Sequence, residues 1–104
     1  MQACTPLASG EILNASHPDW VLIEAVIYGD PTLCAKLSKR LVCAVKHLPL
    51  RLRIDTITDT QVAIEAGVSC DPTLFINGKP FIEGLIAAEE ITVIFQNYLN
   101  KVSQ

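Results

Sequence analysis

Residues 67–84 read GVSCDPTLFINGKPFIEG, and this stretch predicts a β-hairpin that is entered through a proline. Thr73–Ile76 is a β-branched and aromatic run, and Asn77-Gly78 is a dipeptide that tolerates the positive φ values of a tight hairpin turn. A second strand begins at Phe81-Ile82. Pro72 directly precedes the first strand, where its missing N–H costs least, and it is a candidate for a cis peptide bond. Two antiparallel strands are therefore expected here.

Hydrophobic periodicity predicts the other elements. The nearly continuous apolar run at 20–28 is typical of a central strand covered on both faces, and the alternation at 50–56 indicates a strand near an edge. Helical spacing follows residue 31, where Asp30 or Thr32 is the expected cap, and ends before Pro49. Thr58-x-x-Gln61 has the form of a capping box for a short helix to Ala66, and the last helix starts near residue 87. The order βαβαββα predicts a four-stranded mixed sheet flanked by helices.

The hairpin resembles the cis-proline loop of the thioredoxin superfamily, particularly its glutaredoxin-like and disulfide-oxidoreductase branches. The order of elements agrees from about Leu22 to Leu99. Some members carry a buried acid in the first core strand, whereas Glu24 is expected near the exposed start of its strand. The resemblance implies an α/β glutaredoxin-like core with its redox dithiol at the start of the first core helix. The matching residues are Gly67, Val68, Pro72, Thr73, Asn77, Gly78 and Gly84.

Length and composition bound the remaining possibilities. The 104 residues, half of them apolar, suffice for one thioredoxin-like domain over 20–104, preceded by a loosely ordered or docked extension over 1–19 with a helical turn through Ile12-Leu13. A net charge of −3 without a basic run argues against nucleic acid as a partner. No apolar run reaches the roughly 20 residues of a membrane helix, and the first residues do not form a secretory signal. We therefore expect a cytoplasmic protein without a membrane partner.

The expected dithiol is incomplete. A redox pair needs two cysteines separated by two residues at a helix N-terminus, whose positive end lowers the pKa of the first thiol. The chain has Pro31-Thr32-Leu33-Cys34 there. In one register Cys34 takes the second cysteine position and Pro31 replaces the nucleophile; in another Cys34 comes first and Leu37 replaces the resolving cysteine. Neither register restores a pair, so ordinary thioredoxin chemistry is not expected.

The resemblance suggests where a second thiol could come from. In the superfamily, residues just before the cis-proline face the helix that carries the dithiol, so Cys34 and Cys70 are candidates for a non-adjacent catalytic pair. The competing reading is two unpaired thiols at the edge of the core. Pro31, Asp71, Pro72 and Thr73 are the corresponding substrate-binding candidates. A carboxylate at Asp71 would raise a neighbouring thiol pKa, which argues against an efficient nucleophile.

Cys43 is a separate candidate for a reactive thiol. It follows Cys34 by nine residues, about half a turn around and roughly 13 Å along the helix, so these two cannot bond to each other. Cationic side chains surround Cys43 in the helical register and could depress its pKa. A solvated basic face with an incidental cysteine is the alternative interpretation. The cations are Lys36, Lys39, Arg40, Lys46 and, when protonated, His47.

Two functions therefore remain open. The first is a thioredoxin-like protein with a degenerate site and weak or specialised thiol–disulfide chemistry, acting on glutathione or on a protein thiol or disulfide. The second is a redox-inactive module that binds an extended peptide by strand addition. A third hypothesis, ligation of an iron–sulfur cluster, is less well supported, because this sequence does not match the serine and lysine spacing of monothiol glutaredoxins. The cysteine and histidine spacing indicates no metal site, and no cofactor other than possible glutathione is expected.

Overall fold

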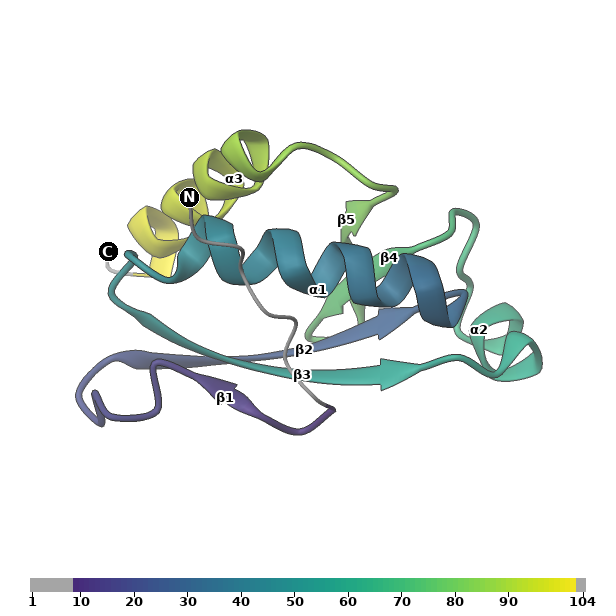
Figure 1. Ribbon diagram of the computed structural model, residues 1–104, viewed down its shortest axis with the longest axis horizontal. Helices are drawn as coiled ribbons and strands as arrows, with labels where there is room; N and C mark the ends of the chain where they lie inside the picture. Colours follow the sequence, from purple (N-terminus) through teal and green to yellow (C-terminus); the bar gives the residue numbers. More distant parts are fainter. Residues whose placement is uncertain (1–8, 103–104) are drawn as a thin grey trace.

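A mixed β-sheet forms the centre of the computed structural model, which describes residues 9–102. Within these residues the sheet has five strands in the order β1-β3-β2-β4-β5. Helix α1 runs across one side of the sheet with α3 beside it, whereas α2 lies at one end (Figure 1). The elements are β1 (Ile12–Leu13), β2 (Val21–Tyr28), α1 (Pro31–Val45), β3 (Leu50–Ile57), α2 (Thr60–Glu65), β4 (Thr73–Ile76), β5 (Lys79–Glu83) and α3 (Ala88–Val102).

Strands β2 to β5 form the sheet core in the predicted order. β2 pairs in parallel with β3, from Val21 opposite Leu50 to Tyr28 opposite Ile57. β4 is antiparallel to both β2 and β5. The hairpin turn has φ values of 56° at Asn77 and 76° at Gly78, so the dipeptide adopts the left-handed conformation expected of it. The predicted α/β thioredoxin-like arrangement is confirmed, with one strand more than the four expected.

The additional strand comes from the segment that precedes β2. We expected a helical turn at Ile12-Leu13, but these residues form β1, which pairs antiparallel with Leu52 and Arg53 of β3. Further contacts extend this pairing: the Gly10 N–H donates to the Ile54 carbonyl at 2.7 Å, and Asn14 Nδ2 donates to the Leu50 carbonyl at 2.9 Å. Without β1, β3 would be an edge strand with unpaired backbone groups, so strand pairing outweighs the local preference for a turn.

One face of the sheet packs against α1 and α3. Alternate residues of β2 and β3 meet the apolar stripes of both helices in a single core, in which Leu37, Leu52 and Phe95 have no exposed surface. Two hydrogen bonds join the helix layer together: the Arg40 guanidinium donates to the Ile86 carbonyl at 3.0 Å, and the Thr92 hydroxyl donates to the Ala44 carbonyl at 2.9 Å. The core therefore fixes α1 firmly along the sheet.

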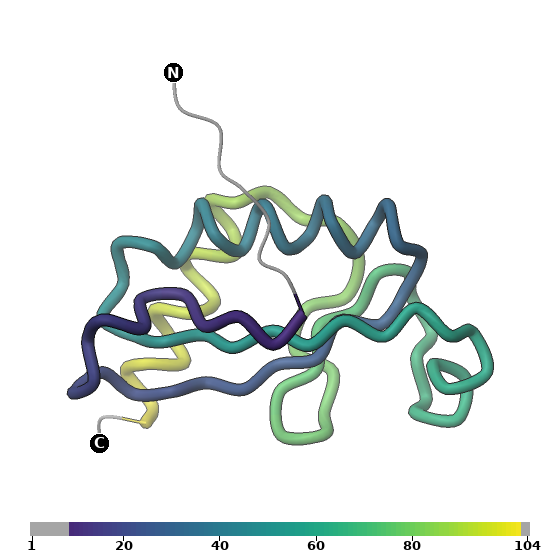
Figure 2. Tube along the Cα trace, turned by 60° about the horizontal axis from the view of Figure 1, so that its bottom comes forward, coloured from purple at the N-terminus to yellow at the C-terminus, as the bar shows by residue number. Residues whose placement is uncertain are grey.

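The opposite face of the sheet is only partly covered, contrary to the prediction that β2 is buried on both sides. Leu22 is 38% exposed, and Glu24 forms an exposed ion pair with Arg53 at 3.2 Å. Tyr28 and Phe75 pack edge to face at the other end of this face. The reason is the size and position of α2, which has six residues, none of them buried, and which sits beyond the strand ends rather than over the sheet (Figures 1 and 2). A short helix at the strand ends leaves a cleft there.

Candidate functional site

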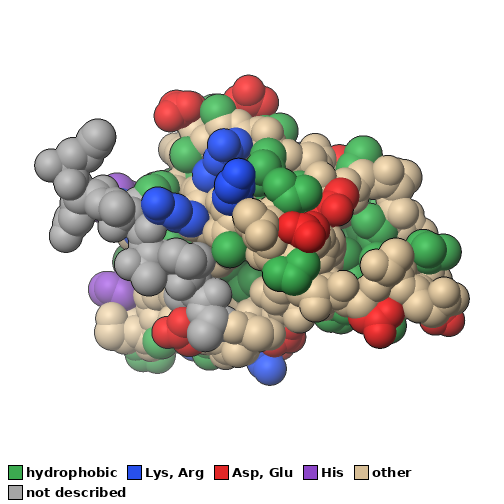
Figure 3. All heavy atoms as spheres, turned by 45° about the vertical axis from the view of Figure 1, so that its right-hand side comes forward, with side chains coloured by type: hydrophobic (Ala, Val, Ile, Leu, Met, Phe, Trp, Pro, Cys, Tyr) green, Lys and Arg blue, Asp and Glu red, His purple; other side chains and the backbone are tan. Residues whose placement is uncertain are grey.

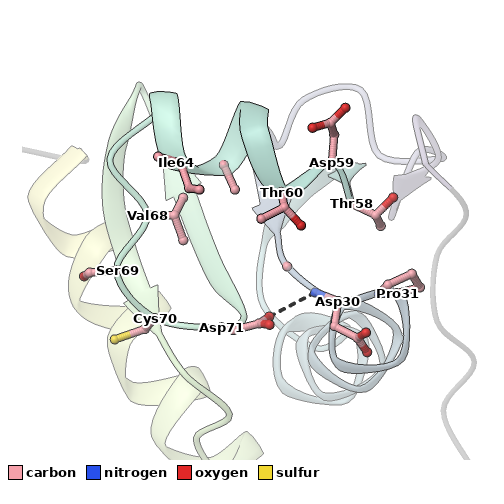
Figure 4. A pocket seen from close by; sticks show the side chains of 12 residues that line it. Asp30, Pro31, Thr58, Asp59, Thr60, Ile64, Val68, Ser69, Cys70 and Asp71 are labelled. Carbon is pink, nitrogen blue, oxygen red and sulfur yellow. Dashed lines mark hydrogen bonds between the residues drawn. The ribbon is translucent and has the colours of Figure 1, made fainter.

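The cleft lies where β2 ends, between the N-terminus of α1, α2 and the loop before β4. It encloses about 420 Å³ and is lined by three carboxylates, Asp30, Asp59 and Asp71, with an apolar wall that includes Ile64 and Val68 (Figure 4). None of the lining residues within 9–102 is Lys, Arg or His. The cleft occupies the position in the fold where the resemblance places the redox site.

Asp30 caps α1, one of the two caps that the sequence allowed. Its carboxylate accepts hydrogen bonds from the N–H groups of Thr32 at 3.0 Å and Leu33 at 3.4 Å. Pro31 occupies the first turn, where a residue without an N–H is well tolerated. The positive end of the helix is thus already paired with a carboxylate, and it is this end that would otherwise favour a thiolate.

Asp71 connects the loop to the start of α1. Its Oδ1 accepts a hydrogen bond from the Asp30 N–H at 3.0 Å, across 41 residues of sequence (Figure 4). Gly29, with φ of 152°, permits this approach, because a Cβ at that position would overlap Asp71 Oδ1 and crowd the Pro72 Cα at 3.1 Å. The Asp71–Pro72 peptide bond is cis. Two carboxylates, those of Asp30 and Asp71, therefore lie at the N-terminal end of α1.

Cys34 lies under these carboxylates in the first turn of α1. Its side chain is 2% exposed and belongs to the core. Burial, reinforced by the charges of Asp71 and Asp30, raises the pKa of the Cys34 thiol to about 11. A thiol with this pKa is protonated at neutral pH, and its burial keeps disulfide substrates away from the sulfur.

Cys70 has the opposite surroundings. It is an exposed free thiol at the edge of the cleft, and its sulfur points away from the Asp30–Asp71 hydrogen bond (Figure 4). Cys34 is likewise a free thiol in the structure. The pairing of Cys34 with Cys70 stays a prediction, since the structure holds one thiol in the core and the other at the surface.

The other substrate-binding candidates divide into two groups. Pro31 and Asp71 line the cleft, whereas Pro72 and Thr73 are buried and do not. Thr73 instead supports the loop, because its hydroxyl donates to the Cys70 carbonyl at 2.6 Å. The Gly84 N–H donates to the Pro72 carbonyl at 2.8 Å and ties the same loop to the end of β5. These two residues therefore shape the loop that borders the cleft.

The loop also presents backbone donors. Ser69, Cys70 and Asp71 are exposed, and their N–H groups find no acceptor among residues 9–102. Adjacent unpaired donors on an exposed segment are the groups that an added strand can engage. This feature could not be read from the sequence, because it depends on what the loop does not contact.

Cys43, the candidate reactive thiol, lies on α1 away from the cleft. It is disulfide-bonded in the structure, so any thiol reactivity belongs to the reduced chain. Cys4 lies outside the described residues. Lys36, Lys39 and Arg40 line a hollow together with Cys43. The cluster is therefore a feature of the α1 surface, separate from the cleft.

Sequence reasoning missed part of the cleft wall. We expected Thr58 to cap the helix that follows β3, but Asp59 is the cap, and its carboxylate accepts from the N–H groups of Gln61 at 2.9 Å and Val62 at 3.2 Å. An aspartate carboxylate caps a helix as well as a threonine hydroxyl does, so the sequence alone did not decide whether Thr58 or Asp59 is the N-cap. Asp59 and Ile64 then line the cleft. Nothing in their spacing signals this, since it follows from where α2 sits.

Within 9–102, no three His, Cys, Asp or Glu side chains gather closely enough to hold a metal ion. In the same part of the chain no helix has the length and apolar character needed to cross a membrane.

Comparison with known proteins identifies a family for this chain. The family model for the thioredoxin domain matches residues 26–96, which run from β2 into α3 and include the whole cleft. Comparisons with curated proteins and with solved structures found no significant match.

Proposed function

Because the chain belongs to the thioredoxin domain family, we propose that it is a binding protein that keeps the fold and the cis-proline loop but does not perform dithiol exchange. The observation that carries this proposal is the state of Cys34. A thiol nucleophile must ionise and reach its substrate, and Cys34 is 2% exposed with its pKa raised to about 11. Carboxylates occupy the helix end beside it.

The ligand class follows from the cleft and its border. The unpaired N–H groups of Ser69, Cys70 and Asp71 suit the backbone of an extended peptide, which would add as a short strand. Beside them, Asp30, Asp59 and Asp71 give the cleft a negative charge, and Ile64 provides an apolar wall. We infer that the partner is an extended protein segment with a basic side chain that enters the cleft.

Peptide selection tests this function. A library of random peptides would be selected on the wild-type protein, and the affinity of the selected peptides measured by fluorescence anisotropy. Ile64→Lys places a cation on the cleft wall at a position that is 63% exposed, so it should weaken binding at least about tenfold. Val93→Lys makes the same change at a 54% exposed position on α3 and should leave affinity within about twofold.

Two outcomes would contradict the proposal. Selected peptides that are not enriched in Lys or Arg, or that bind Ile64→Lys as tightly as wild type, would show that the acidic cleft is not the binding site. A dithiol activity would also contradict it. In an assay with dithiothreitol as the electron donor, the wild type would then reduce glutathione disulfide or insulin faster than Cys34→Ala does. That result would identify Cys34 as a reactive thiol.

The exposure of Cys70 favours a second candidate function, monothiol exchange. A Cys70 thiolate would attack a disulfide of glutathione or of a partner protein; the old S–S bond breaks, a mixed disulfide forms, and the other sulfur leaves as a thiolate. Mass spectrometry after incubation with glutathione disulfide tests this step. Modification of the wild type that is lost in Cys70→Ser supports it, whereas an unmodified Cys70 leaves peptide binding as the function.

A further inference from the structure

Positive charge is concentrated in one part of the chain, although the net charge is −3. Residues 31–54 contain six of the eight Lys and Arg residues and none of the eleven Asp and Glu residues. Four of these cations, Lys36, Lys39, Arg40 and Lys46, belong to α1 and its C-cap. The acidic residues elsewhere include those of the cleft. The molecule therefore has a basic side formed by one helix, although its overall charge is negative.

The cations share the face of α1 that points away from the core. Lys36, Lys39, Arg40 and Cys43 recur at intervals of three and four residues, opposite the buried Leu37 and Leu41. Lys36 and Lys39 are exposed, and neither is paired with a carboxylate within residues 9–102. Arg40 is held in place by its hydrogen bond to the Ile86 carbonyl. Cationic charge is thus available along the helix, and part of it is rigidly positioned.

This face is hollowed where α1 meets the start of α3. A hollow of about 390 Å³ is lined by Lys36, Lys39, Arg40, Cys43 and Ala88, and we call it the basic groove. Figure 3 shows a group of Lys and Arg side chains gathered beside hydrophobic side chains on one face of the molecule. Glu89 and Glu90 follow Ala88 but line a separate hollow with Val93 and Ile94. The basic groove is therefore lined by cations and small or apolar groups.

We propose that the basic groove docks an acidic segment of a partner protein. Carboxylate side chains complement the three cations, and the hollow has the dimensions of a few side chains rather than of a flat electrostatic surface. Among residues 9–102, the lining of the groove includes no aromatic side chain on which a nucleic acid base could stack. The lining residues that the structure describes also include no large apolar residue of the kind with which a surface helix enters a membrane. A peptide carboxylate is the anion that fits best.

Binding to this surface should be weak and sensitive to salt. Exposed ion pairs contribute little individually, and charges farther apart than about 8 to 10 Å are screened at physiological ionic strength. We expect a short fluorescein-labelled oligoglutamate peptide to bind the full chain at about 50 mM salt and to dissociate at about 300 mM. This site is independent of the acidic cleft, which would repel the same peptide.

A pair of matched variants tests the proposal. Lys36→Glu with Lys39→Glu reverses two charges in the groove, and Lys79→Glu with Lys101→Glu makes the same change in net charge on β5 and α3. All four lysines are exposed, so neither variant should disturb folding. We expect the dissociation constant for oligoglutamate, measured by fluorescence anisotropy, to rise at least about tenfold in the first variant and less than about twofold in the second.

Several results would overturn the proposal. Two of them are the absence of measurable oligoglutamate binding at low salt and an equal loss of affinity in both double variants. A single-stranded oligonucleotide of the same length that binds more tightly, with the same dependence on Lys36 and Lys39, would assign the groove to nucleic acid. Salt-sensitive self-association of the wild type in analytical ultracentrifugation, lost in Lys36→Glu with Lys39→Glu, would make a second copy of the chain the occupant.

Discussion

At the scale of single residues, Cys34 is a buried cysteine whose surroundings oppose its ionisation. The thiol remains at the start of α1, where a thioredoxin-like mechanism would use it, but Asp30 and Asp71 hold the helix end and the core covers the sulfur. Both effects favour the neutral thiol, burial more than charge. Cys34 is therefore best understood as a core residue of this protein.

The raised pKa of Cys34 predicts a pH dependence of stability. In the folded chain the thiol stays protonated up to about pH 11, whereas in the unfolded chain it ionises near its ordinary value of 9.0. Above pH 9, ionisation of the thiol lowers the free energy of the unfolded state but not that of the folded state, so stability falls as pH rises. Two pKa units correspond to about 2 to 3 kcal/mol between pH 9 and 11.

Comparison with Cys34→Ala isolates this contribution from other groups that titrate in the same range. The free energy of unfolding would be measured by urea denaturation of both proteins from pH 7 to pH 11. We expect the difference between wild type and variant to be constant below about pH 8.5 and then to fall. A difference that stays constant to pH 11 would show that Cys34 ionises as easily in the folded chain as in the unfolded one.

The close packing around Gly29 leads to a second prediction at this scale, which concerns stability. Gly29→Ala should destabilise the protein by about 2 to 4 kcal/mol, because the new methyl group adds overlap with Asp71 to the backbone strain of a positive φ. Gly67→Ala is the matched control: Gly67 also has a positive φ, of 85°, but no atom of the described residues lies within 4 Å of the position that a Cβ would take. Urea denaturation should show a loss of only about 1 kcal/mol there. Equal losses would contradict the close approach of Asp71 to Gly29.

At the scale of elements, the two capping aspartates have different consequences. Asp30 caps α1, which has fifteen residues and packs on the core, whereas Asp59 caps α2, which has six residues and buries none. Asp30→Ala should therefore lower the global free energy of unfolding by about 1 kcal/mol. Asp59→Ala should leave global stability nearly unchanged, because α2 can unfold locally while the core persists.

Amide hydrogen exchange distinguishes these two effects. In Asp59→Ala, we expect faster exchange at residues in and next to α2, including Ala63 and Ala66, with no change in the strands of the core. Circular dichroism during urea denaturation gives the global value for both variants. A loss of global stability in Asp59→Ala as large as that in Asp30→Ala would show that α2 unfolds together with the core.

The elements also show what the sequence could and could not predict. Alternation at Leu50, Leu52 and Ile54 and the Asn77-Gly78 turn are local signals, and the structure places them as expected. The strand at Ile12-Leu13 has only two residues and depends on the edge of β3, so local patterns could not show it. The open sheet face and the cleft depend on where the six-residue helix α2 lies relative to the sheet. Hydrophobic periodicity can predict a helix but not its position in the fold.

At the scale of the whole molecule, charge is separated into two surfaces. In the described part of the chain, the lining of the cleft at the N-terminus of α1 has carboxylates and no cations, whereas the hollow on the outer side of the same helix has cations and no carboxylates. α1 connects the two and is held by the core along its length. A basic peptide in the cleft and an acidic segment in the basic groove would thus bind to different parts of one rigid helix.

The burial of Cys34 predicts that its thiol becomes accessible only when the whole molecule unfolds, and thiol labelling can measure this. Cys34 shares one core with residues of β2, β3 and α3, so iodoacetamide should reach it only when that core opens, whereas Cys70 should react at the rate of an exposed thiol. With cleavage and mass spectrometry to assign each modified cysteine, the opening free energy obtained from Cys34 labelling should equal the global value from urea denaturation. A clearly lower value would mean that the first turn of α1 opens on its own. Such local opening would expose Cys34 to substrates and would make thiol–disulfide exchange at this residue feasible.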